Sequence, residues 1–88
     1  MKAAEIHVGD ALRAALLLTG NIEAAESAVA EAIAAGQRSG EISTGIEPGR
    51  LAGTLIDGFE GATLRAKATG QTGPVDDFLT ITLDRLLS

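Results

Sequence analysis

Apolar residues in this chain recur at intervals of three and four positions, which is the spacing that places them on one face of an α-helix. Four segments have this pattern, and turn residues separate them. The segments cover residues 8–19, 21–39, 48–69 and 74–87. The pattern therefore predicts an all-α domain of four helices, with residues 1–88 forming a single unit.

Capping residues mark the ends of the predicted helices. Gly20 stops the first helix, and Asn21 is suited to cap the second, since its side chain can accept hydrogen bonds from free backbone N–H groups. Gly40 predicts the C-cap of the second helix. Pro48 and Pro74 stand at first helical positions, where the missing N–H of proline has no cost. These signals agree with the boundaries that the apolar pattern predicts.

The third segment carries two distinct surfaces. One is a continuous apolar arc centred on Phe59, which we expect to face the core. The other is a narrow strip with little side-chain bulk, formed by Gly53, Gly61 and Leu64. A glycine in a helix interior costs about 1 kcal/mol relative to alanine, and the interior of this segment contains three, Gly53, Gly58 and Gly61. We expect the close approach of another backbone to compensate for that cost.

The fourth segment is apolar over more than half of its circumference. A helix on the surface of a monomer needs an apolar stripe of only about 100° to 140°. The excess indicates burial on two sides, by the same subunit and by a second copy. We therefore expect a dimeric helical bundle that forms through the last two helices. The expected interface residues are Gly53, Gly61, Leu64, Phe78 and Ile81.

The expected core is thin. The hydrophobic content is 45%, but 16 of those residues are alanine and only two are phenylalanine. A domain of 88 residues buries about 60 to 65% of its unfolded surface, so its stability is marginal without a partner. The predicted core residues are Leu16, Val29, Ile33, Leu55, Ile56, Phe59, Leu79 and Leu86.

Charge and composition exclude several classes of function. The net charge of -5 disfavours nucleic-acid backbones and anionic membranes, which attract clustered Lys and Arg. The longest apolar run, Ala14 to Leu18, is far too short to span a bilayer. We expect no nucleic-acid or membrane partner. A soluble cytoplasmic protein is the default expectation.

Catalytic and metal-binding chemistry has little support in the sequence. His7 is the single histidine and there is no cysteine, so the ligands of a transition-metal site are missing. Asp76 and Asp77 fall in the first turn of the fourth helix, where the helix dipole favours negative charge, and they need no catalytic explanation. We expect no enzymatic activity and no cofactor.

The second half of the chain resembles a known family. The segments AGQRSGEI, PGRLAGTLIDGFEGATLRAKA and PVDDFLTITLDRLL, within residues 35–88, are similar to the end of the regulatory domain of tetracycline-repressor (TetR) family transcription regulators. In that family the last two helices pair with those of a second subunit, so the resemblance implies a homodimer. The family's N-terminal helix-turn-helix and most of its ligand-pocket helices have no counterpart in this sequence.

The first part shows a different similarity. Residues 12–33, LRAALLLTGNIEAAESAVAEAI, resemble the opening helices of region 2 in extracytoplasmic-function sigma factors, where an L-T-G-N-x-x-x-A-E pattern joins two packed helices. The sigma segments that contact promoter DNA have no counterpart here. Two resemblances that meet near Ile33 to Gly36 are compatible with a truncated remnant or with a chimera.

The function that the sequence favours is non-enzymatic self-association by a TetR-like C-terminal region. Two alternatives remain open at this point. One is an engineered or chimeric helical protein with no evolved function. The other is a binder of a small apolar ligand, with a cavity between helices around Phe59 and Leu16.

Overall fold

The computed structural model describes residues 3–18 and 21–86, except for the side chains of residues 15–18 and 86. The described part is helical and contains no strand, which confirms the predicted all-α class with four helices. The first three helices are α1 (Ala3–Leu18), α2 (Ile22–Arg38) and α3 (Pro48–Thr69). The fourth consists of α4 (Gly73–Asp77), a π-helical turn η1 (Phe78–Thr82) and α5 (Leu83–Leu86).

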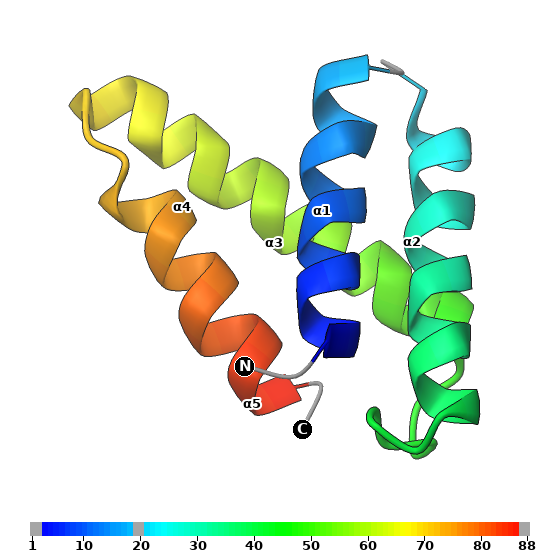
Figure 1. Ribbon diagram of the computed structural model, residues 1–88. Helices are drawn as coiled ribbons and strands as arrows, with labels where there is room; N and C mark the ends of the chain where they lie inside the picture. Colours follow the sequence, from blue (N-terminus) through cyan, green and yellow to red (C-terminus); the bar gives the residue numbers. More distant parts are fainter. Residues whose placement is uncertain (1–2, 19–20, 87–88) are drawn as a thin grey trace.

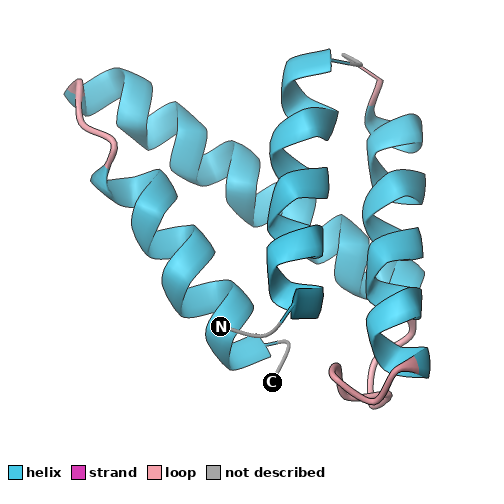
Figure 2. Cartoon of the chain, viewed as in Figure 1, coloured by secondary structure: helices cyan, strands magenta, loops and turns pink. Residues whose placement is uncertain are grey.

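The helices form two pairs. Figure 1 shows α1 and α2 side by side and antiparallel, while α3 crosses behind them and extends past α1. The last helix folds back along the far part of α3, and α5 contacts α1. Figure 2 shows that a longer loop joins α2 to α3, whereas a short connection joins α3 to α4. The hairpin of α3 and α4 therefore extends beyond the α1–α2 pair.

Local chemistry accounts for the helix ends. Asn21 Oδ1 accepts hydrogen bonds from the N–H groups of Glu23 and Ala24, at 3.0 and 3.3 Å, which caps α2 as predicted. The C-cap of α2 is Ser39 rather than Gly40, and Gly40 follows it with a φ of 83°. Glycine reaches that left-handed conformation without steric cost, so it ends the helix from the next position.

The first helix begins at Ala3, five residues before the predicted start at residue 8. The early turn has a packing role, because Ala4 is buried together with Val8 and Leu12 along one stripe. Alanine is the best helix former, but its small side chain gives a weak apolar signal. The sequence pattern therefore identified this stripe only from Val8 onward.

A single core joins all four helices. Among the residues expected to form it, six are buried, and they come from α2, α3 and the last helix. They are Val29, Ile33, Leu55, Ile56, Phe59 and Leu79. The side chains of Leu16 and Leu86, which were also expected there, lie outside the described residues. Val8 and Leu12 of α1, Leu51 and Ala52 of α3, and Leu83 of α5 are further members.

Phe59 provides a direct test of the core. Its side chain is 6% exposed, and its ring lies edge-on to that of Phe78, with centroids 5.9 Å apart. We expect Phe59→Ala to lower the free energy of unfolding by about 3 to 5 kcal/mol, since it removes a large buried side chain and leaves a cavity. Denaturant titration measures this loss. A loss below about 1 kcal/mol would show that the ring contributes little to the core.

Candidate functional site

The outer face of the α3–α4 hairpin is the candidate site. A tight reversal after α3 sets the hairpin geometry, because Gly70 caps the helix with a φ of 68° and the N–H of Gln71 bonds to the carbonyl of Ala66 at 3.2 Å. Thr72 precedes α4, and its carbonyl accepts from the N–H groups of Val75 and Asp76. The short turn brings α4 and η1 next to α3, while the end of the last helix leaves α3 and contacts α1 (Figure 1).

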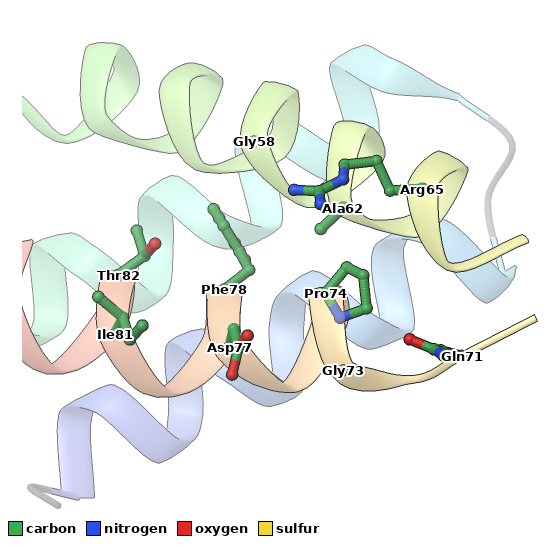
Figure 3. Close-up of a pocket in the computed structure, with 10 residues that line it drawn as sticks. All are labelled: Gly58, Ala62, Arg65, Gln71, Gly73, Pro74, Asp77, Phe78, Ile81 and Thr82. Carbon is green, nitrogen blue, oxygen red and sulfur yellow. The ribbon is translucent and has the colours of Figure 1, made fainter. Parts of the chain in front are cut away.

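An open groove of about 530 Å³ runs between the two helices. Figure 3 shows its lining, with side chains from α3 facing those from α4 and η1. We call this surface the α3–α4 groove. It is lined by Gly58, Ala62, Arg65, Gln71, Gly73, Pro74, Asp77, Phe78, Ile81 and Thr82. Small residues of α3, Gly58 and Ala62, lie opposite the larger Phe78 and Ile81 of the last helix. Arg65 and Asp77 are the charged residues of the lining.

A contact within the same chain explains why residue 58 is a glycine. A Cβ placed on Gly58 would lie 2.5 Å from Cε2 of Phe78, so the absence of a side chain is what allows the ring to pack against α3. Gly53 lies beside α2, where its Cβ position is 3.6 Å from the carboxylate of Glu26. Contacts within the chain therefore account for Gly58 and place Gly53 beside α2, so neither glycine requires the backbone of a second subunit.

The remaining residues of the expected interface differ in exposure. Leu64 and Ile81 are 69% and 61% exposed, which is unusual for large aliphatic side chains. A Cβ on Gly61 would meet no atom within 4 Å. Phe78 is only half-buried, although Gly58 and Phe59 cover one side of it. The structure brings Phe78 and Ile81 together in the groove, whereas Leu64 lies outside the groove lining on α3.

The π-helical turn at Phe78–Thr82 interrupts the last helix where it borders the groove. A π turn contains an extra residue, and such turns occur frequently at functional sites. The apolar pattern predicts an uninterrupted helix over 74–87. Apolar spacing does not report a single inserted residue when the apolar positions already cover most of the helix.

The polar residues considered for metal binding or catalysis, His7, Asp76 and Asp77, lie at the surface. His7 is exposed on α1, and within residues 3–18 and 21–86 no group of three His, Cys, Asp or Glu side chains is placed to hold a metal ion. Asp76 and Asp77 are exposed and are the last two residues of α4. Phe59 does not line the α3–α4 groove. Across the same described ranges, no helix has the length and apolar character needed to cross a membrane.

A family comparison identifies the domain. Residues 8–82 match the model of the family described as "Tetracyclin repressor-like, C-terminal domain". The chain belongs to this family. The matched range of this tetracyclin repressor-like domain includes residues 12–33, so it covers the segment that resembles sigma-factor region 2 as well as α3, α4 and η1. A join between two sources near Ile33 to Gly36 is therefore not favoured.

Further comparisons with the curated proteins and with the solved structures gave no match. The family places this tetracyclin repressor-like domain among parts of regulatory proteins rather than among enzymes.

The contact between Gly58 and the Phe78 ring can be tested by substitution. We expect Gly58→Ala to lower the free energy of unfolding by about 1 to 3 kcal/mol, since the new methyl group displaces the Phe78 ring. Urea titration measures the change. Gly53→Ala is the matched control on the same helix, because its Cβ would make only ordinary contact with Glu26. Equal or higher stability for Gly58→Ala would show that Phe78 does not depend on this glycine.

Proposed function

We propose that this domain is a self-association module in which two copies pair through the outer faces of α3 and the last helix. The observation that carries the proposal is the exposure of Leu64 and Ile81, at 69% and 61%, on the two helices that form the groove. Ile6, Ile22 and Ile46 are also exposed, but they lie on α1, on α2 and in the loop before α3. Among the side chains that the structure describes, the α3–α4 hairpin is where two exposed aliphatic residues and a groove occur together.

The shape of the hairpin supports a four-helix arrangement. A symmetric dimer places the same surface on both sides of the interface, so each groove has to accept side chains from an identical partner. Ile81 lies at the groove and is largely exposed, which makes it suitable for insertion between the helices of the partner. Gly61 leaves open space on α3, where a second helix can approach closely.

Charge in the groove is compatible with self-pairing. Arg65 comes from α3 and Asp77 from α4, and both line the groove. Two-fold symmetry would allow Arg65 of each subunit to face Asp77 of the other. Such pairs at the rim contribute about 0 to 1 kcal/mol each, so their role is to set the orientation while apolar contacts supply the affinity. Family membership adds support, because the C-terminal helices of TetR regulators pair subunits.

Leu64→Glu tests the proposal. We expect the wild-type chain to be dimeric at about 100 μM and the variant to be monomeric, since the two-fold interface would bury two unpaired carboxylates. Size exclusion with light scattering gives both masses. Ile22→Glu is a matched control, because it places the same charge on another exposed aliphatic residue, on α2. It should remain dimeric.

Two results would show that self-association by this surface does not occur, and a third would move it to another surface. One is a wild-type mass of a single chain under these conditions. The other is a Leu64→Glu variant that stays dimeric with unchanged stability. Loss of the dimer in both Leu64→Glu and Ile22→Glu would place the interface elsewhere.

Gly61→Ala gives an independent test through the sign of its effect. In a monomer, alanine should stabilise the helix by about 1 kcal/mol, because a Cβ at this position meets only open space. In a dimer with a second backbone against Gly61, the methyl group should instead weaken association. We expect a larger dimer dissociation constant for Gly61→Ala, measured by sedimentation equilibrium. Tighter or unchanged association would remove Gly61 from the interface.

A further inference from the structure

Glu5 is a buried acid without a full set of hydrogen bonds. Its side chain is 1% exposed in α1, and its Oε2 atom has no hydrogen-bond partner. Among the described residues it is the one buried charged side chain, and the buried residues around it are apolar. A buried carboxylate oxygen without a partner is costly, so its presence calls for an explanation.

Glu5 borders a cleft of about 220 Å³ between α1 and the end of the last helix. The cleft is lined by Ile6, Gly9, Asp10 and Arg13 of α1, and by Leu79 and Leu83. None of these residues lines the α3–α4 groove. We call it the Glu5 cleft. It is a second concave surface, separate from the face proposed for self-association.

The walls of the Glu5 cleft are apolar. Leu79 and Leu83 line it from the last helix, and half-exposed Ile6 lines it from α1. Leu83 also approaches α1 closely, since a Cβ on Gly9 would lie 3.3 Å from Leu83 Cδ1. Apolar walls around a few polar groups are typical of sites that bind small molecules.

The charges of the cleft favour a cation next to Glu5. Arg13 is eight residues from Glu5, which places it about 12 Å farther along the helix at 1.5 Å per residue. Asp10 is three residues from Arg13 and five from Glu5, so it stands nearer to Arg13 and offsets its charge. Among the described lining residues, the end of the cleft near Glu5 therefore carries the Glu5 charge alone and is negative.

We propose that the Glu5 cleft binds a primary ammonium group carried on a short aliphatic chain. The ammonium donates a hydrogen bond to Glu5 Oε2, and the aliphatic chain lies against Leu79 and Leu83. An ammonium fits because it is compact, carries three donors and has no acceptor that would need a partner of its own. A metal ion fits less well, because the described residues provide no group of three carboxylate or histidine ligands.

The same ammonium chemistry has two sources. It can belong to a free alkylamine, or to a lysine side chain of a second copy. Both place the same group next to the same oxygen. The two differ in whether occupancy depends on added amine or on protein concentration.

The experiment titrates the full chain with n-pentylamine at constant pH and ionic strength. NMR follows the ¹³C resonance of the Glu5 carboxyl group, and thermal unfolding is measured in parallel. Pentan-1-ol and pentanoate are the matched probes, because they keep the chain length and replace the ammonium. We expect saturable movement of the Glu5 resonance and a dose-dependent rise in Tm with the amine alone, since binding to the folded state stabilises it by mass action.

Two variants locate the effect. Glu5→Gln keeps the size of the side chain and removes its charge, and we expect it to weaken amine binding at least about tenfold. Asp10→Asn, at the edge of the cleft, should weaken it less than about threefold. Leu64→Glu should leave amine binding unchanged, so failure of the dimer proposal and failure of this one can be told apart.

Several outcomes overturn the proposal. These are no saturable movement of the Glu5 resonance with the amine, an equal response to pentan-1-ol, or amine binding of equal strength in Glu5→Gln. A Glu5 resonance that moves with protein concentration without added amine, in Leu64→Glu as well as in the wild type, supports the ammonium site and assigns the group to a lysine of a second copy. Movement in the wild type alone reports the α3–α4 dimer, and the amine titration then decides.

Discussion

The packing of Phe78 against α3 is the contact on which the arrangement of this domain depends. The ring lies over Gly58 and meets Phe59 edge-on, with an angle of 75° between the ring planes. This contact joins the last helix to the central helix of the core. Because the chain has two aromatic side chains and both are used here, no other aromatic pair can replace it. The groove, the exposed Ile81 and the contact of α5 with α1 all depend on how this contact orients the last helix.

Most of the fold follows from the sequence because its helices have clear local signals. Asn21, Pro48 and Gly70 stand where a helix has to start or stop, and the structure uses each of them. The arc centred on Phe59 could be predicted because its apolar residues are large and regularly spaced. The start of α1 could not, since its first turn packs through Ala4, and alanine gives a similar signal in buried and exposed helices.

The candidate site was less accessible to sequence reasoning, because it depends on which neighbour each residue meets. Gly58 and Gly61 look equivalent in a sequence, yet Gly58 faces a ring of its own chain and Gly61 faces open space. Glu5 is similar in this respect. A glutamate in the first turns of an amphipathic helix is normally solvated, and only the tertiary packing of α1 against the other helices shows that this one is covered.

The π-helical turn makes the last helix tolerant of the loss of one residue at this place. Within Phe78–Thr82 the chain carries one residue more than a regular α-helical turn needs. Because the wide turn absorbs that residue, its removal would restore regular winding and leave Phe78 facing Gly58 and Leu83 facing Gly9. The same deletion in the regular winding of α3 would rotate everything after it by about 100°. A deletion in Phe78–Thr82 therefore differs from a deletion elsewhere, because the contacts of the last helix with α3 and with α1 would both remain.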